Sequence, residues 1–349
     1  MVPRTLLAAL VAFVAALAFA GGASAYGWPV RPFDRPHPIR GGFGDPRTVF
    51  TLGFFSDPWA GPGTFSFHNG VDISARAGTP VYPVTSGIAH IRTAGEVEVE
   101  SPLPNATRRV FQYEHITLHV QEGQRVVARK TILGLVQATA GHVHLTEIDG
   151  FRVTNPLLKG HLAPYGDRTR PSVAEILLTR PANGAEVGSA AVCGRIALSA
   201  EAFDRPVLPT PQPWTGLPIA PALVTWKLTK LDGTVLIPSR AAADFRTTVP
   251  PNPLFWAVYA RGTYQNAPRF GLQQFGGLPG RFLYVLSPTL DTRTLPNVVA
   301  LVTVGVKDER GNLGGLSLRI FVYNNPRGAA CPEPPPPVTT TTTTTTSGP

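Results

Sequence analysis

Charged residues are scarce in this 349-residue chain: Asp, Glu, Lys and Arg make up 15% of it, against 43% hydrophobic residues. This balance excludes a wholly disordered chain, which is poor in apolar residues and rich in charge. Sulfur is scarcer still, with two cysteines and one methionine. Beyond the N-terminal segment no run holds the roughly twenty unbroken apolar residues of a membrane span. We therefore expect no stable membrane span after that segment is removed.

What the chain does have is basic charge, glycine and proline. Thirty-one Lys and Arg against 22 Asp and Glu give a net charge of +9, and the chain holds 35 Gly and 37 Pro. A basic surface suits nucleic acid, membrane headgroups or an anionic wall polymer. Clusters of cations interleaved with aromatic residues are absent from the sequence, so we expect no nucleic-acid partner. The glycine and proline content favours loop-rich β structure.

Residues 1–25 have the layout of a secretory signal peptide. A single cation, Arg4, precedes an apolar run over 6–20, and the segment ends in the small residues Ala-Ser-Ala at 23–25. This order is typical of an exported protein cleaved after Ala25. We expect a secreted or cell-envelope-associated bacterial protein, with an uncleaved N-terminal anchor as the alternative. The other end, 332–349, is a Pro-rich and Thr-rich stretch that predicts a disordered tail.

Between these ends the composition predicts two β domains. The first covers 26–163 and holds all eight histidines, and a linker is expected at 164–171. The second, 172–331, shows strand-length apolar runs and an Asp232-Gly233 hairpin signal, without helical period. We expect an immunoglobulin-like β-sandwich there.

The two cysteines, Cys193 and Cys331, are an even pair in a chain with an export signal. Such a pair is more often bridged than reactive. We expect a disulfide that ties the chain end to the second domain. Neither cysteine has another Cys or His nearby at zinc-ligand spacing.

Four of the eight histidines of the first domain fall in three separate groups. His68 and Asp72 are four residues apart in a segment that reads as strand and turn, where positions i and i+4 share a face. His142 and His144 alternate with Val143 and Leu145, which predicts a strand with both imidazoles on one side. Two histidines and one aspartate form a three-ligand zinc set that leaves a fourth position for water.

The third group, Tyr113 and His115, is expected on another strand. It belongs to an ordered set of motifs between about 41 and 156. In chain order these motifs are G42-F-G-D-P-R, H68-N-G-V-D, Y113-E-H-I, G123-Q-R-V and H142-V-H-L. This set resembles the lysostaphin-type (LytM-type) zinc endopeptidases, which cut peptides of bacterial peptidoglycan. The resemblance implies an all-β peptidase domain of the duplicated hybrid motif kind, followed here by the sandwich.

The resemblance also implies the site. Its zinc ligands fall on His68, Asp72 and His144, with one Zn²⁺ per chain, and its catalytic histidines fall on His115 and His142. The implied activity is a metalloendopeptidase that hydrolyses peptidoglycan peptide bonds through a zinc-activated water. Which histidine acts as base and which as oxyanion donor stays open, as do the bond cut and the oligomeric state.

Two other functions remain as alternatives. One is a non-catalytic relative that binds the wall or activates another hydrolase, and the other is a structural β protein with coincidental histidines. The second domain is expected to bind a wall polymer or a protein. A further hypothesis is self-inhibition, in which residues 43–66 or the sandwich cover the groove until they are displaced.

Two departures from the family pattern concern substrate choice. The loop before His142 is short, and Thr146 stands where the family often has an acidic residue, with Glu147 one place later. His37, His90, His119 and His161 are interpreted as structural or solvent-exposed residues. Arg47 is interpreted as a packing or salt-bridge residue.

Overall fold

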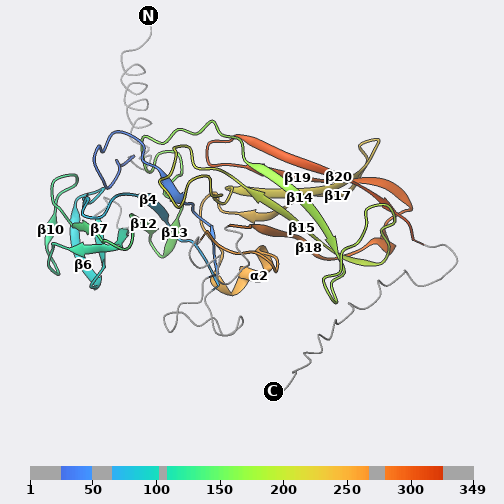
Figure 1. Ribbon diagram of the computed structural model, residues 1–349, viewed down its shortest axis with the longest axis horizontal. Helices are drawn as coiled ribbons and strands as arrows, with labels where there is room; N and C mark the ends of the chain where they lie inside the picture. Colours follow the sequence, from blue (N-terminus) through green and yellow to red (C-terminus); the bar gives the residue numbers. More distant parts are fainter. Residues whose placement is uncertain (1–24, 49–64, 102–107, 267–279, 325–349) are drawn as a thin grey trace, which may run out of the picture.

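The computed structural model describes residues 25–48, 65–101, 108–266 and 280–324, which Figure 1 draws in colour. The fold is almost entirely β, which confirms the predicted class. Among the described residues no helix is long and apolar enough to cross a membrane. Residues 1–24 of the predicted signal segment, the tail and Cys331 lie outside the described residues.

The first region is built on an eight-stranded antiparallel sheet in which seven strands follow one another and β13 pairs with β12. In spatial order the strands are β1 (Ile39–Gly41), β4 (Val71–Ser74), β12 (His142–Asp149), β8 (Arg109–Glu114), β7 (Glu96–Ser101), β6 (Gly87–Thr93) and β10 (Arg125–Val126), with β13 at Arg152–Thr154. The central strand β12 sets the site, because its register places His144 opposite Asp72 of β4 and Glu114 of β8.

Two small sheets complete this region. One joins β5 (Pro80–Val81), β11 (Gly134–Val136) and β9 (Ile116–Leu118), and the other joins β2 (Pro46–Arg47) and β3 (Ser66–Phe67). The second pair matters for the site, since β3 ends directly before His68 and β2 carries Arg47.

The second region consists of a three-stranded and a four-stranded antiparallel sheet. The strands are β14 (Ser172–Thr179), β15 (Arg195–Phe203) and β18 (Leu283–Asp291) in one sheet, and β17 (Val235–Asp244), β16 (Leu223–Lys230), β19 (Val298–Lys307) and β20 (Leu313–Val322) in the other. Short helical turns lie at η1 (Asn252–Leu254), α2 (Phe255–Val258) and η2 (Thr292–Thr294).

Alternate residues of β15, β16 and β19 are buried, which is the pattern of strands that face a common core on one side. The predicted hairpin joins β16 to β17, and Gly233 at its turn has φ 88°, a conformation that favours glycine. Trp226 is 3% exposed, as a core residue should be. The immunoglobulin-like connectivity remains a prediction.

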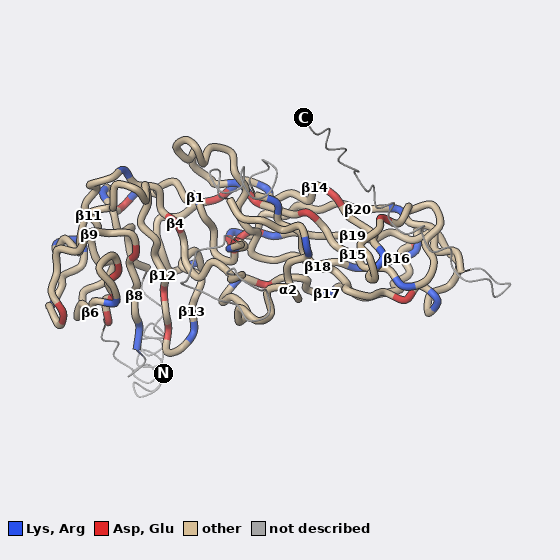
Figure 2. The backbone as a smooth tube through the Cα atoms, turned by 60° about the horizontal axis from the view of Figure 1, so that its bottom comes forward, with Lys and Arg blue, Asp and Glu red and all other residues tan. Residues whose placement is uncertain are grey.

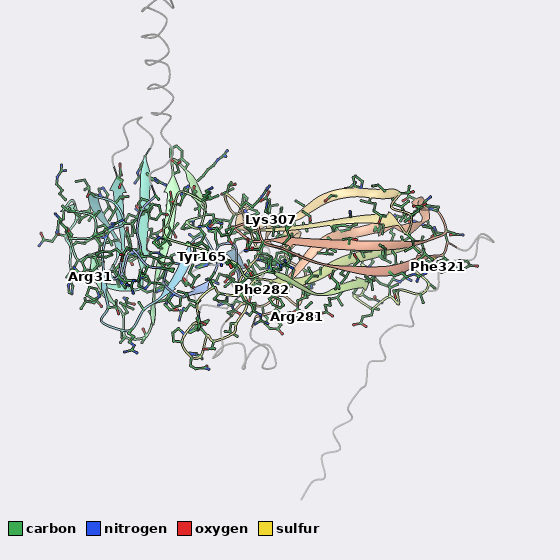
Figure 3. All side chains as sticks on the ribbon, turned by 90° about the horizontal axis from the view of Figure 1, so that it is seen from above. Arg31, Tyr165, Arg281, Phe282, Lys307 and Phe321 are labelled. Carbon is green, nitrogen blue, oxygen red and sulfur yellow. The ribbon has the colours of Figure 1, made fainter. Side chains whose placement is uncertain are left out.

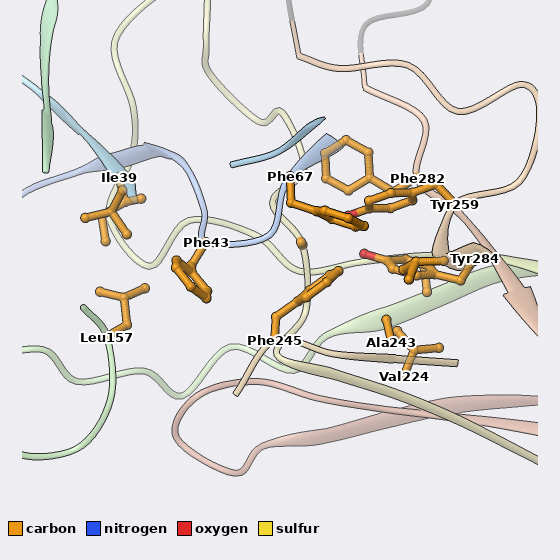
Figure 4. Close-up of a cluster of buried hydrophobic side chains, with 14 of the residues drawn as sticks. Ile39, Phe43, Phe67, Leu157, Val224, Ala243, Phe245, Tyr259, Phe282 and Tyr284 are labelled. Carbon is orange, nitrogen blue, oxygen red and sulfur yellow. The ribbon is translucent and has the colours of Figure 1, made fainter. Parts of the chain in front are cut away.

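The two regions lie end to end in an elongated molecule, and their side chains pack into one core at the junction (Figures 1 and 4). Phe67 of the first region meets Phe245 and Tyr259 of the second, with ring centroids 5.8 Å apart in each pair. The Tyr259 hydroxyl donates a 2.6 Å hydrogen bond to the Gly44 carbonyl. The sandwich therefore packs against the loop that precedes β2.

Charge is distributed along the whole molecule. Figure 2 shows Lys and Arg interspersed with Asp and Glu over both regions, with no cationic end. Along the described backbone the basic residues are thus not confined to one region.

Candidate metal centre

Three side-chain atoms converge at the start of β12. His68 Nε2 lies 2.9 Å from His144 Nδ1 and 3.1 Å from Asp72 Oδ1, and His144 Nδ1 lies 3.0 Å from Asp72 Oδ1. All three residues are buried, at 4%, 9% and 5% exposure for His68, Asp72 and His144. The structure therefore brings together the three residues that the sequence motifs single out as ligands.

The orientation of His68 is fixed by the backbone of the G42-F-G-D loop. Its Nδ1 lies 2.6 Å from the Gly42 carbonyl oxygen, which accepts a hydrogen bond, so Nδ1 carries the proton and Nε2 has a free lone pair. Burial and, to a smaller extent, the positive charge of Arg47 lower the pKa of His68 to about 3. A histidine that stays neutral is in the form that binds metal.

His144 is held from the opposite side. Its Nε2 lies 2.7 Å from Thr146 Oγ1 and 3.7 Å from Glu114 Oε1, so that nitrogen carries the proton and Nδ1 faces Asp72. Burial opposes charge on His144, yet the hydrogen bond to Asp72 and the charge of Glu114 outweigh it and raise its pKa. A positive charge is thus favoured at this point.

The donor set fits a zinc ion. Two imidazole lone pairs and a carboxylate oxygen all point inward, and three acceptors repel one another unless a cation lies between them. In a tetrahedral site with Zn–N near 2.0–2.1 Å, ligand atoms are separated by about 3.3 Å. The observed distances between the three ligand atoms are 2.9, 3.0 and 3.1 Å, so these atoms need to move apart only slightly to reach that value.

Asp72 interacts with several of the charged and titratable side chains around this centre. Burial works against its ionisation, but His68, His142 and Arg47 together hold its pKa well below the usual range. Arg47 Nη2 donates to Asp72 Oδ2 at 3.0 Å, which leaves Oδ1 for the centre. The interpretation of Arg47 as a salt-bridge residue is confirmed.

The two predicted catalytic histidines lie side by side next to the triangle. The ring centroids of His115 and His142 are 4.4 Å apart, and His142 Nε2 is 3.4 Å from Asp72 Oδ1. Burial and, to a smaller extent, the neighbouring His142 lower the pKa of His115 to about 4. His115 is therefore neutral and able to accept a proton near pH 7.

Local structure differs from the sequence prediction at two of these residues. His68 and Asp72 do not share one strand, because His68 follows β3 and Asp72 lies in β4. Gly70 between them has no room for a side chain: a Cβ there would lie 2.4 Å from the Leu145 carbonyl oxygen and 2.7 Å from His144 Nε2. His115 is also not in a strand, since β8 ends at Glu114.

The backbone of His115 turns out of the sheet with φ 65°. A non-glycine residue in this region carries local strain, which is common at functional sites. The turn points the ring toward His142 instead of continuing the alternation of β8. The prediction for β12 is confirmed: His142 and His144 project on one side, while Val143 and Leu145 are fully buried on the other.

Several residues at the centre had no signal in the sequence that would predict their contacts. Arg40 Nη2 lies 3.5 Å from His142 Nε2, and the Arg40 guanidinium stands 4.1 Å from the ring centroid of Trp214 in the second region. Glu114 supplies the negative charge beside His144. Glu147 does not, because it points to the other face of β12, where it forms an ion pair with Arg109 and a hydrogen bond with His161.

The other histidines lie away from the triangle, as interpreted. His90 pairs with Glu122 at 2.8 Å on the surface, His37 contacts the Pro32 carbonyl at 3.0 Å, and His161 contacts Glu147 at 2.8 Å. His119 is exposed.

Comparison with known proteins finds similarity among solved structures. A zinc-containing peptidase from Vibrio cholerae is 25% identical, with 38% of this chain and 39% of that chain covered and a TM-score of 0.28. The catalytic domain of lysostaphin from Staphylococcus simulans is 22% identical, with 33% and 86% covered and a TM-score of 0.24.

The catalytic domain of the prophage-encoded EnpA from Enterococcus faecalis is 20% identical, with 42% and 100% covered and a TM-score of 0.26. These matches fall in the peptidase group that the sequence motifs resemble. No protein-family model and no curated protein matches the chain. At TM-scores this low the likeness carries no argument about chemistry, which rests on the side chains of the centre.

Proposed function

We propose that this protein is an exported zinc metalloendopeptidase that hydrolyses peptide bonds of bacterial peptidoglycan. The observation that carries the proposal is the convergence of three acceptor atoms, His68 Nε2, Asp72 Oδ1 and His144 Nδ1, with two further histidines beside them. With the other nitrogen of each ring hydrogen-bonded on its far side, His68 Nε2 and His144 Nδ1 direct their lone pairs, together with Asp72 Oδ1, at a common point.

Zinc, when bound, lowers the pKa of water toward neutrality and polarises a peptide carbonyl. His68, Asp72 and His144 would hold it. Their outer partners keep the ligand atoms aimed inward: the Gly42 carbonyl for His68, Arg47 for Asp72, and Thr146 with Glu114 for His144. Such partners fix tautomer and ring orientation.

The remaining chemistry falls to His115 and His142. One accepts the proton of the attacking water and delivers it to the leaving amine. The other donates to the oxyanion that forms at the scissile carbonyl. Both rings border the same space, and Arg40 adds a cation beside His142. We assign these two roles to the pair without dividing them.

The substrate class follows from the family resemblance and from the export signal at residues 1–25. A basic chain at a bacterial surface is attracted to the anionic wall. We propose that the sandwich holds the metal-centre loop in place and positions the enzyme on its substrate. We also propose the division into 26–163, 164–171 and 172–331 and the disulfide between Cys193 and Cys331 as parts of this account.

The test measures release of soluble peptide fragments from purified peptidoglycan by residues 26–349 loaded with zinc. Wild type is expected to release fragments, and His115→Ala to lose at least about a hundredfold in rate while keeping its zinc, since general acid–base catalysis contributes 10²–10⁴-fold. His119→Ala is the matched control, because it removes an exposed histidine four residues along. Equal rates for wild type and His115→Ala would refute the enzymatic assignment.

A further inference from the structure

A second cluster of acidic residues lies at the junction, away from the histidines. Asp167, Asp204 and Asp308 each offer an oxygen, and these oxygens lie within 4.8 Å of one another. Asp167 lies in the 164–171 segment, Asp204 follows β15, and Asp308 follows β19. Figure 3 places Tyr165, two residues before Asp167, and Lys307, next to Asp308, at this junction. Three separate segments thus bring carboxylates to one point.

All three carboxylates are buried, with exposures of 8% for Asp167, 1% for Asp204 and 2% for Asp308. Buried carboxylates are normally paired with a cationic side chain or a metal ion. Among the described ranges no Lys, Arg or His forms an ion pair with any of them. The three carboxyl groups therefore have no cationic partner within the part of the chain that the structure describes.

The arginines next in sequence are engaged elsewhere. Arg310 donates to the carbonyl oxygens of Tyr165 at 2.9 Å and Leu157 at 2.7 Å, and its guanidinium stacks over the Tyr165 ring. Arg205 donates from Nη1 to the Gly216 carbonyl at 3.0 Å. Neither guanidinium neutralises the cluster.

Hydrogen bonds satisfy only part of the cluster. One oxygen of each aspartate accepts from nearby backbone: Asp167 Oδ1 from Thr169 N at 2.7 Å, Asp204 Oδ1 from Arg205 N at 2.8 Å, and Asp308 Oδ1 from Asn312 N at 2.8 Å. Asp308 Oδ2 also accepts from the Asn312 amide at 2.5 Å, and Asp167 Oδ2 accepts a long hydrogen bond from the Tyr165 hydroxyl at 3.5 Å. Asp204 Oδ2 is buried and has no hydrogen-bond partner among the described residues.

We propose that Asp167, Asp204 and Asp308 bind one divalent cation, with Ca²⁺ as the best match, and so tie the 164–171 segment to the sandwich. Ca²⁺ takes oxygen ligands at 2.3–2.6 Å. Oxygens up to about 4.8 Å apart can therefore contact the same ion from opposite sides. The unpartnered Asp204 Oδ2 is the ligand that the protein alone leaves unsatisfied.

Two further features support the cation. Burial, together with the charges of Asp167, Glu309 and Asp308, raises the pKa of Asp204 to about 8, which shows how poorly the cluster tolerates uncompensated charge. A surface hollow lined by Gly166, Asp167, Arg168, Thr169 and Val207 gives an ion a path to Asp167. A set of protonated acids is the competing explanation for the same cluster.

The test titrates CaCl₂ into residues 26–349 that have been stripped of metal and freed of chelator, and it records heats of binding and Tm. One equivalent should bind, and a Ca²⁺ concentration a hundred times Kd should raise Tm by about 5 °C. The experiment is run both without zinc and with one equivalent of zinc, so its result does not depend on the histidine centre. MgCl₂ is the second probe, because Mg²⁺ demands shorter bonds and keeps its waters.

Asp204→Asn and Asp167→Asn keep the oxygen that accepts from backbone and remove one negative charge. Both variants should lose the Ca²⁺-dependent rise in Tm, while without Ca²⁺ their Tm equals or exceeds that of wild type because repulsion is relieved. A purely structural role predicts a lower Tm with and without Ca²⁺. Asp232→Asn, in the exposed β16–β17 turn, is the control and should keep the rise.

Two results would overturn the proposal. One is wild type that shows neither binding heat nor a Tm shift with Ca²⁺, which would favour shared protons. The other is an unchanged Ca²⁺ shift in both Asn variants. A shift with Mg²⁺ and none with Ca²⁺ would contradict the choice of ion.

Discussion

His68 Nε2 faces His144 Nδ1 across 2.9 Å, and the hydrogen bonds on the far sides of both rings leave each of these nitrogens with its lone pair directed at the other. Asp72 Oδ1 closes the triangle. Two lone pairs at this separation repel unless a proton or a metal ion lies between them. The geometry of the centre is therefore the geometry of a cation site, and the predictions below test what holds it in shape.

Arg47→Ala should weaken zinc binding by about 10–100-fold, the usual effect of losing an outer partner of a metal ligand. Arg47 Nη2 holds Asp72 Oδ2 at 3.0 Å, and without that bond the carboxylate is free to rotate. The measurement is a competition titration against a chromogenic zinc chelator. Arg92→Ala, which removes an exposed arginine of β6, is the control. Unchanged affinity in Arg47→Ala would show that Asp72 is oriented without it.

Gly70→Ala should reduce both zinc content and stability. The added Cβ would lie 2.4 Å from the Leu145 carbonyl oxygen and 2.7 Å from His144 Nε2, so either the β3–β4 connection or His144 must move. The check is zinc per chain together with Tm. Gly78→Ala has open space around the new Cβ but a φ of 78°, so it serves as a control for backbone strain alone. It should lose stability and keep its zinc.

Phe245→Ala should cost about 3–5 kcal/mol in the free energy of unfolding, as expected for a buried aromatic side chain. Phe245 is fully buried in the junction core, where it packs against Phe67 and under Gly44. Because the same loop gives its Gly42 carbonyl to His68, peptidase activity should fall as well. Phe321→Ala, at an exposed position in β20, should change neither quantity appreciably. Full activity in Phe245→Ala would show that the sandwich does not support the site.

The raised pKa of Asp45 predicts that the free energy of unfolding depends on pH. Burial raises its pKa from 3.8 to about 7, against the lowering effects of Arg47 and of the backbone donors Ala220 and Gly42. The folded state therefore holds a proton that the unfolded state has lost between pH 4 and 7. Stability should fall as pH rises through that window, with a slope of up to about 1.4 kcal/mol per pH unit, and level off above pH 7.

The measurement for Asp45 is denaturant unfolding at pH 5, 6, 7 and 8. The asparagine of the Asp45→Asn variant does not titrate. The free energy of unfolding of the variant should therefore fall less steeply between pH 5 and 7 than that of wild type, and the difference in slope is the contribution of the Asp45 proton. Parallel curves for the two proteins would place the ionisation of Asp45 outside the window.

Those parts of the site that depend only on the two-residue period of a β-strand could be predicted from the sequence. In β12 the alternation of polar and apolar residues is enough to put His142 and His144 on one side, because a strand has only two faces. The positions of His68 and His115 were not predictable in this way. Each follows the end of a strand, and a non-glycine φ of 65° at His115 is imposed by tertiary contacts that no local pattern records.

Contacts between the two regions could not be predicted from the sequence either. Trp214 covers Arg40, and Phe245 packs on the loop that orients His68, from positions far along the chain. The sequence indicates that both residues belong to a β-sandwich but not which surface of the first region they meet. The segment 164–171, predicted as a linker, also makes a contact that the sequence does not indicate. Its Asp167 is buried close to Asp204 and Asp308.

The most direct test of the account is the zinc content of purified, metal-reconstituted protein, measured by mass spectrometry of the element after removal of free metal. Wild type and His119→Ala should each hold about one zinc per chain. His144→Ala should hold almost none, because two of three ligands cannot retain the ion through dialysis. Zinc-free wild type, or equal zinc in wild type and His144→Ala, would contradict the assignment of His68, Asp72 and His144 as the metal centre.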